Sequence, residues 1–276
     1  MASGSELQSF LVLGPLEVQR AGEPVDIAGV KLRRLITMLA LQPQGVALPD
    51  SDLFEALWPE GPPRSAEESL RVHISRLRRL IGPEAVVRRP GGYALEVAAP
   101  SIDALQFEAL VEAARAARSN GGSRALDAYR EAERLWRGEV AADVDFERAP
   151  PRAVELNELH LVATEERVDL ALALGLGPEL IPELESLVAR HPLRERLRGQ
   201  LMLALYAGGQ QAQALQVYRD TRAQMIDELG VEPGPELRDL EKRILTQDPD
   251  LPRAQTPIVR ATRRRRLAVV VAAVAA

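Results

Sequence analysis

Apolar residues along the first hundred positions follow two different periods. Between residues 10 and 20 apolar and polar side chains alternate, and a second short apolar stretch follows at 25–27. Alternation places every second side chain on one face, so these stretches predict a small antiparallel sheet. From Lys31 onward the apolar residues recur at steps of three and four, which is typical of one buried helical face and predicts a helix that ends near Gly45.

Two further helices and a hairpin are predicted after this first helix. Residues 49–58 have the apolar spacing of a second helix, and a turn rich in proline separates it from a third, which starts at an N-capping serine and covers 65–81. Two short strands, at 85–89 and 93–97, flank a Pro-Gly-Gly turn and predict a β-hairpin. Sheet, three helices and hairpin together predict a winged helix-turn-helix.

The rest of the chain has an almost continuous helical pattern. The predicted helices cover residues 102–118, 122–138, 150–174, 178–190, 193–207, 210–229 and 234–247. A six-residue pattern at 125–130 recurs at 214–219, and small residues within 201–218 stand where the paired helices of a tetratricopeptide repeat approach each other. We therefore predict a mainly α chain with a disordered N-terminus at 1–9, a winged-helix domain at 10–98, an all-α, tetratricopeptide-like domain at 102–248 and a tail at 249–276.

The charge of the whole chain gives no sign of a nucleic-acid partner, but its local distribution does. Lys and Arg total 35 against 40 Asp and Glu, for a formal net charge of −5. Between residues 64 and 89, in contrast, seven arginines stand against three glutamates. This segment holds the third predicted helix and the hairpin, so a stripe of positive charge is expected on those two elements.

The third predicted helix divides its residues between two faces. Its inward face carries Leu70, Ile74, Leu77 and Ile81. On the opposite face Val72 could contact a thymine methyl in the major groove while Arg76 reaches a guanine. The alternative is a surface helix with a solvated charge stripe, on which an exposed valine needs no explanation. The hairpin that follows favours DNA, because Arg88 and Arg89 supply the cationic side chains with which a wing reaches phosphates or the minor groove.

Other basic residues near this helix are weaker candidates. Lys31, Arg33 and Arg34 begin the first predicted helix, where phosphate contacts and an ordinary solvated face are equally compatible with the pattern. His73 lies at the flank of the third helix, which favours a phosphate contact or plain solvation over base readout. Tyr93 is predicted to pack the wing onto the helix.

The segment VHISRLRRLIG at 72–82, together with the wing RRPGGYAL at 88–95, resembles the DNA-binding domain of OmpR-type response regulators, and this resemblance covers residues 10–97. The remainder resembles the bacterial transcriptional activation domain of the actinobacterial antibiotic-regulatory proteins, the SARP family. The segments that carry this second resemblance are LWRGE at 135–139, ALY at 204–206 and DELGVEPGPEL at 227–237. The two together cover nearly all of the chain.

The resemblance implies a set of partners and residue roles. It implies an activator that binds direct repeats in double-stranded DNA near promoters, as a homodimer or as side-by-side copies, and that recruits RNA polymerase. Matched position by position, it assigns base readout to Ser69, Val72 and Arg76, and backbone contacts to Arg79, Arg88 and Arg89. Beyond the resemblance, we add Arg71, His73, Lys31 and Arg34 as further candidates for backbone contacts. Larger members of the family continue into an ATPase domain, but a proline-rich linker stands at that point here, so no ATP dependence follows.

Catalytic, metal and cofactor sites are not indicated. The chain has no cysteine, which excludes thiol nucleophiles, disulfides and cysteine-based zinc sites. His160 and His191 have no partners at metal-ligand spacing and are interpreted as structural or surface residues. No phosphate-binding loop, dinucleotide fingerprint or nucleophile elbow is present. We therefore expect neither an enzyme nor a cofactor.

The two ends of the chain bear on localisation. The first residues lack the basic start and apolar run of a signal peptide, so the chain is expected to be cytoplasmic. At the other end, four arginines at 263–266 precede ten apolar residues. Two interpretations stay open: a frayed tail, or the start of a membrane segment beyond residue 266 that would tether a longer native protein.

Three functions are compatible with this pattern. The first is a sequence-specific transcriptional activator. The second is a protein-interaction scaffold in which the tetratricopeptide-like half binds a peptide and the winged helix does not read DNA. The third, which is compatible with the first, is a ligand sensor with a pocket between the helices of 102–247. No cluster of polar residues indicates such a ligand.

Overall fold

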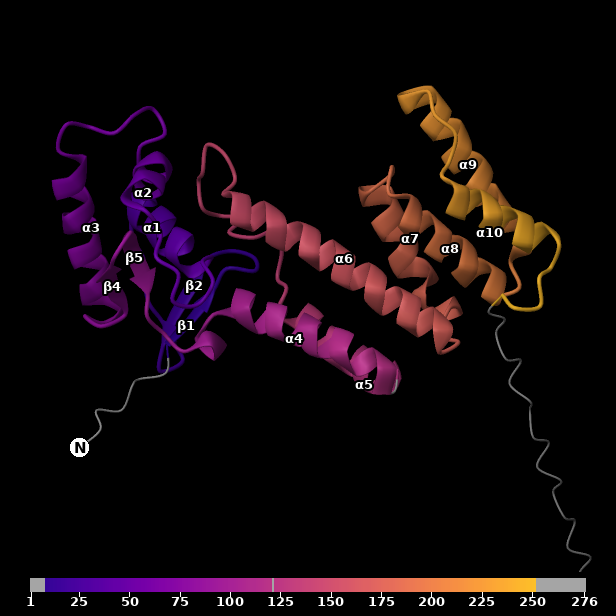
Figure 1. Ribbon diagram of the computed structural model, residues 1–276, viewed down its shortest axis with the longest axis horizontal. Coiled ribbons are helices and arrows are strands. Elements are labelled where there is room, and N and C mark those ends of the chain that lie inside the picture. Colours follow the sequence, from indigo (N-terminus) through magenta and orange to yellow (C-terminus); the bar gives the residue numbers. More distant parts are fainter. Residues whose placement is uncertain (1–7, 121, 252–276) are drawn as a thin grey trace, which may run out of the picture. The chain divides into compact units, whose positions relative to one another are not determined.

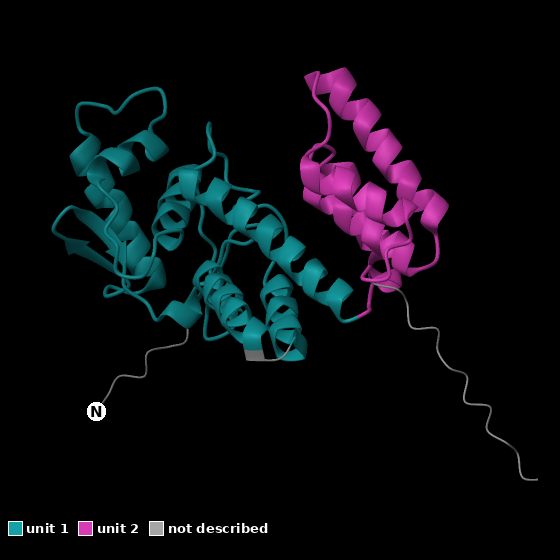
Figure 2. Cartoon of the chain, turned by 45° about the vertical axis from the view of Figure 1, so that its right-hand side comes forward, with its two compact units in different colours: residues 1–174 teal, residues 175–276 magenta. Residues whose placement is uncertain are grey.

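The computed structural model describes residues 8–120 and 122–251, and it is mainly helical with two small antiparallel sheets (Figure 1). This confirms the predicted fold class. The described residues form two compact units, one that ends at Leu174 and one that begins at Gly175, which Figure 2 colours separately. The predicted boundary at 98–102 thus lies inside the first unit, so the winged helix and the helices that follow it pack together. As a division between sequence modules, that boundary stays a prediction.

The first unit begins with the expected small sheet. Its elements, in chain order, are β1 (Gln8–Leu11), β2 (Glu17–Arg20), β3 (Glu23–Pro24), α1 (Val30–Ala40), α2 (Asp50–Leu57), α3 (Ala66–Ile81), β4 (Val86–Arg89), β5 (Gly92–Leu95), α4 (Asp103–Ala117), α5 (Gly122–Arg134) and α6 (Pro151–Ala173), with short 3₁₀ turns at Ala99–Ser101 and Arg118–Asn120. β2 pairs with both β1 and β3 in antiparallel register.

Two predicted boundaries near the start of this unit are wrong, and the helix predicted at 122–138 also ends early, at Arg134. The third strand was expected at 25–27 but lies at Glu23–Pro24, and pairing continues only through the Val25 N–H, which donates to the Val18 carbonyl at 2.7 Å. The first helix was expected to reach Gly45 but ends at Ala40. Pro43 follows closely, and a proline disfavours helical backbone in the residue before it.

The three helices and the wing form the predicted helix-turn-helix arrangement. α1 packs against α2 and α3, and β4 pairs with β5 as a two-stranded wing. Leu48 and Tyr93 exchange backbone hydrogen bonds of 2.8 and 3.0 Å, which fasten the wing to the segment before α2. Gly92 has a φ of +152°, and a Cβ there would lie 1.8 Å from the Leu48 carbonyl oxygen. Only glycine therefore permits this attachment, which holds the wing beside α3.

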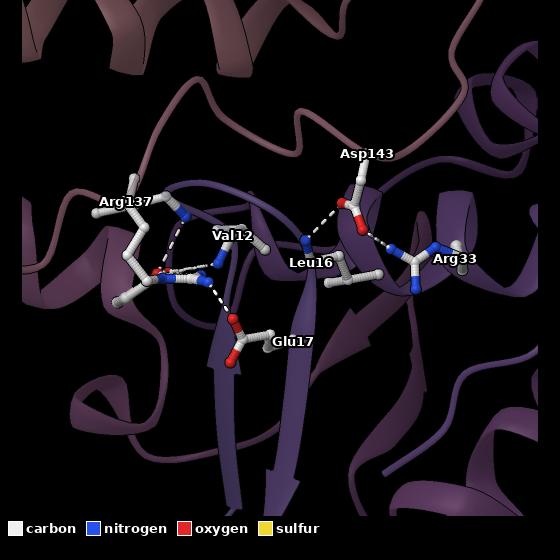
Figure 3. Close-up of polar contacts among 8 residues, drawn as sticks. Val12, Leu16, Glu17, Arg33, Arg137 and Asp143 are labelled. Atoms are coloured by element: carbon white, nitrogen blue, oxygen red, sulfur yellow. Dashed lines mark hydrogen bonds and ion pairs between the residues drawn. The ribbon is translucent and has the colours of Figure 1, made fainter. Parts of the chain in front are cut away.

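One continuous hydrophobic core joins the winged helix to the helices after it, with buried members from Phe10 to Ala163. A buried polar contact reinforces this junction. Asp103, the first residue of α4, is 2% exposed, and its carboxylate accepts the backbone N–H groups of Val12 and Leu13 at 2.8 and 3.0 Å. Arg137 lies 3.6 Å from the same carboxylate. It also pairs with Glu17 at 2.6 Å (Figure 3). The loop after β1 is therefore tied to α4 and to the segment after α5.

The second unit is a small helical bundle. Its elements are α7 (Ile181–Arg190), α8 (Glu195–Ala207), α9 (Gln211–Leu229) and α10 (Pro235–Leu245), preceded by a 3₁₀ turn at Pro178–Leu180. α8 packs against α7 and α9, and α10 covers both α8 and α9. Ala204 and Ala214 are fully buried, in agreement with the small residues expected where a tetratricopeptide helix pair closes. Among the described residues no helix combines the length and apolar character needed to cross a bilayer, and the tail at 252–276 lies outside them.

Candidate nucleic-acid interface

The outer face of α3 is the first component of the interface. The inward residues of α3 are buried as predicted, namely Leu70, Ile74, Leu77 and Ile81. Val72 is 46% exposed, Arg76 and Arg79 are exposed, and Ser69 is half-buried beside them. Acidic residues in the first turn of α3 and basic residues in its last turn also match the helix dipole. Ser65 stands at the N-cap position as expected, but its side chain makes no capping hydrogen bond.

The arginines of α3 differ in what they bind within the protein. Within the described part of the chain, Arg76 and Arg79 form neither an ion pair nor a side-chain hydrogen bond. Arg71 pairs with Glu67 one turn earlier at 3.3 Å. Arg78 is half-buried, and its Nε donates to the Val86 carbonyl at 2.8 Å, which links α3 to the wing. Two guanidinium groups on this face are thus available to an external acceptor, while Arg78 is a structural residue.

The wing arginines are both engaged by acidic side chains. Arg88 Nη1 lies 2.5 Å from Asp50 Oδ1, and its guanidinium stacks over the Tyr93 ring at 4.6 Å. The hydrogen bond to Asp50 raises the pKa of Arg88 above its ordinary value. Arg89 pairs with Glu96 across the hairpin. Tyr93 is 7% exposed, which confirms its prediction as a core residue.

A concave surface of about 350 Å³ lies between α3 and the wing, and its lining residues are Asp50, Glu67, Leu70, Arg71, Arg88 and Tyr93. Two arginines and two carboxylates therefore face each other in this depression. The sequence pattern did not indicate that Asp50, Glu67 or Glu96 pair with arginines. The Glu67–Arg71 pair could have been found from its four-residue helical spacing, but the other two pairs depend on how the wing folds back.

Arg34 is buried, which corrects its prediction as a DNA contact. It is 8% exposed, and its guanidinium donates to the carbonyls of Asp145 and Ala56. The segment at 141–146 contacts α1 at Arg34 and covers this side chain. Arg34 is therefore not accessible to a phosphate. Lys31 remains accessible in part, with its ammonium 4.6 Å over the Trp58 ring.

His73 occupies a half-buried position at the flank of α3. Its ring lies 6.3 Å from the Trp58 ring, and Nδ1 is buried without a hydrogen-bond partner among the described residues. Burial, followed by the charges of Lys31 and Arg76, lowers the pKa of His73 below its ordinary value of 6.5. The imidazole is therefore neutral at pH 7 and carries no charge for a phosphate.

This lowered pKa predicts a pH dependence of stability. Between the folded pKa of His73 and 6.5 the unfolded chain binds the proton more tightly, so the free energy of unfolding falls as the pH drops below about 6.5. Replacing His73 by glutamine, which stays neutral, is expected to remove part of that fall. Thermal unfolding followed at a series of pH values checks it, and an unchanged pH profile in the variant would contradict the assignment.

The remaining histidines do not form a metal site. His160 stacks on Trp136 with ring centroids 4.0 Å apart, and His191 is half-buried after α7. Residues 8–120 and 122–251 contain no group of three or more side chains that could hold a metal ion.

Comparison with known proteins gives matches over most of the chain. Residues 23–95 match the family described as transcriptional regulatory protein, C terminal, and residues 102–245 match the bacterial transcriptional activator domain. Regulatory protein AfsR of Streptomyces coelicolor is 43% identical over 88% of this chain, which spans only 24% of that protein. Regulatory protein DnrI of Streptomyces peucetius is 36% identical over 88% of this chain and 93% of its own length.

A solved structure has the same fold. The structure of EmbR from Mycobacterium tuberculosis, in complex with a low-affinity phosphopeptide, superimposes with a TM-score of 0.83 at 34% identity. The match covers 89% of this chain and 66% of that one.

Proposed function

Because this chain belongs to the SARP family of transcriptional regulators, we propose that it binds double-stranded DNA in a sequence-specific manner and activates transcription. The observation that carries the proposal is the outer face of α3, where Arg76 and Arg79 are exposed and unpaired within the described residues, beside an exposed Val72. A solvated surface helix that does not bind DNA would expose the same residues. The adjacent wing, which carries Arg88 and Arg89, and the similarity to proteins named as regulators favour DNA over an interaction scaffold.

Residue roles follow from position on this surface. An α-helix with its side chains is about 10 to 12 Å in diameter and fits the major groove, which is about 12 Å wide. The 16 residues of α3 extend for about 24 Å. We assign base readout to Val72 and Arg76, with Ser69 as a third contact. Phosphate contacts are assigned to Arg71, Arg79, Arg88, Arg89 and Lys31. His73 is neutral and half-buried, so only a hydrogen bond from its ring could contribute.

The partners of the helical part are also proposed. An activator must reach RNA polymerase, and we assign that contact to the segment that matches the activator domain, 102–245. Binding as a homodimer or as tandem copies on direct repeats follows from the family resemblance. Access to the chromosome places the described residues in the bacterial cytoplasm. A tether beyond residue 266 lies outside the described residues.

Selection from a randomised duplex pool, followed by titration at two salt concentrations, tests the proposal. A DNA-binding surface of this kind predicts a directly repeated motif and a steep fall of affinity with salt, by about 0.9 in log–log slope for each phosphate contacted. Uniformly weak binding without a preferred sequence would instead favour the scaffold.

Replacing Arg88 by alanine is expected to weaken binding to all duplexes alike. The wing contacts phosphates in this proposal, so the loss should be equal for selected and scrambled DNA, and the salt slope should decrease by about 1. Fluorescence anisotropy with the two duplexes measures both quantities. Arg124→Ala, an exposed arginine on α5, is the matched control for the lost charge. A loss confined to the selected duplex would contradict a backbone role.

A further inference from the structure

Three of the arginines assigned to phosphates are already paired with carboxylates of the free protein. Arg89 pairs with Glu96 across the hairpin, and the other two pairs face the concave surface between α3 and the wing. In these two pairs, Asp50 holds Arg88 and Glu67 holds Arg71, at 2.5 and 3.3 Å. All four of these side chains line that surface. Arg76 and Arg79, which lie outside this lining, have no such partner among the described residues.

A carboxylate and a phosphodiester each offer a guanidinium two acceptor oxygens that it can bind side by side. An arginine can therefore exchange one for the other without changing its own geometry. The two pairs are held loosely, since the side chains of Arg88 and Asp50 are 53% and 32% exposed, and those of Arg71 and Glu67 are 69% and 74% exposed. Exposed pairs of this kind contribute little to stability, so breaking them is not a large barrier.

The Tyr93 ring gives Arg88 a support that does not depend on Asp50. The ring is buried, it is fixed by the backbone bonds to Leu48, and the guanidinium lies over its face. A guanidinium that leaves Asp50 would keep this contact. Arg88 can therefore turn toward a phosphate while its stem stays in place.

We propose that Asp50 and Glu67 act as internal phosphate substitutes, which Arg88 and Arg71 exchange for the DNA backbone when the duplex enters. This rests on the proposed function of the same surface. The two carboxylates lower the affinity for every duplex by the same factor, because each backbone contact first requires an internal pair to open. Discrimination between sequences comes from the α3 face, whereas these two acids lower the affinity for all duplexes alike.

The test measures dissociation constants of the full chain for the selected duplex and for a scrambled duplex of the same composition. Asp50→Asn is expected to tighten binding to both by about twofold to fivefold, with their ratio unchanged. Asp52→Asn is the matched control: it lies in the same turn of α2, is exposed, and accepts a hydrogen bond from Ser51 rather than from an arginine. It removes the same charge and should give a smaller gain.

Double variants show whether the gain passes through the arginine. On an Arg88→Ala background, Asp50→Asn should give no more than the Asp52→Asn control, and Glu67→Gln should likewise lose its gain on an Arg71→Ala background. Three results would overturn the exchange: weaker binding by Asp50→Asn, which would make Asp50 a positioning residue; a gain equal to that of Asp52→Asn; or a gain that persists without Arg88. If the unmodified chain does not distinguish the two duplexes, the proposed function itself fails.

Discussion

Replacing Asp103 by alanine is expected to lower the free energy of unfolding of the first unit by about 3 to 5 kcal/mol. Among the described residues, Asp103 is the only acceptor of the Val12 and Leu13 N–H groups, and the substitution removes it. These groups lie in a region closed to water, since Asp103 is 2% exposed. Each buried donor left without a partner costs about 1 to 3 kcal/mol. Arg137 also loses a nearby charge, at 3.6 Å.

Tryptophan fluorescence measures this loss selectively. The two tryptophans of the chain, Trp58 and Trp136, both lie in the first unit, so urea unfolding followed by their emission reports on that unit. Asp143→Ala is the matched control. That carboxylate also accepts a backbone N–H, from Leu16 at 2.6 Å, but its side chain is 43% exposed (Figure 3). Water can replace this carboxylate as the acceptor, so Asp143→Ala should lower the free energy of unfolding by only about 1 kcal/mol. Equal losses from the two variants would refute the argument from burial.

The charge on Asp103 affects stability in a direction opposite to that of most carboxylates. Burial raises the pKa of Asp103 above its ordinary value, although the backbone donors and Arg137 oppose the shift. The folded protein therefore binds this proton more tightly than the unfolded chain does. The contribution of Asp103 falls as the pH rises from about 3.8 through the folded pKa, and it is constant above that. Protonation of this residue in acid is not expected to unfold the unit, so the large effect of alanine comes from the lost acceptor.

Replacing Arg76 by alanine is expected to cost about 1 to 3 kcal/mol in binding to the selected duplex and to relax the preference at one base pair. A guanidinium that bonds a guanine edge with two donors cannot be replaced by water without losing that discrimination. Its exposed position and lack of an internal partner among the described residues mean that no protein contact is broken by the change. Folding should therefore be unaffected.

Two further variants separate base readout from charge. Arg76→Lys keeps the positive charge but not the fork, so its affinity for scrambled DNA should be retained while the preference at the same base pair is lost. Arg79→Ala, assigned to the backbone, should weaken all duplexes alike. Affinities for the selected duplex and for its single-base-pair variants measure these effects. Equal losses on every duplex from Arg76→Ala and Arg79→Ala would refute the division of roles.

The local pattern of the chain was sufficient to predict the elements that form this surface. α3 runs from Ala66 to Ile81 as expected, because its buried face repeats with the helical period and Gly82 and Pro83 end it. The wing was predictable from its Pro-Gly-Gly turn. The roles assigned to Ser69, Val72 and Arg76 stay predictions, since position on a face does not by itself establish a contact with DNA.

Contacts between distant segments determine which side chains of that surface are accessible to DNA. Arg34 falls next to the buried face of α1, but only the segment at 141–146 determines that it is covered. Asp50 and Arg88 are 38 residues apart, and they meet because Gly92 allows the wing to lie against the start of α2. Hydrophobic period and turn chemistry act between near neighbours and can be read along the chain, whereas burial and ion pairing depend on which distant segments the folded core brings together.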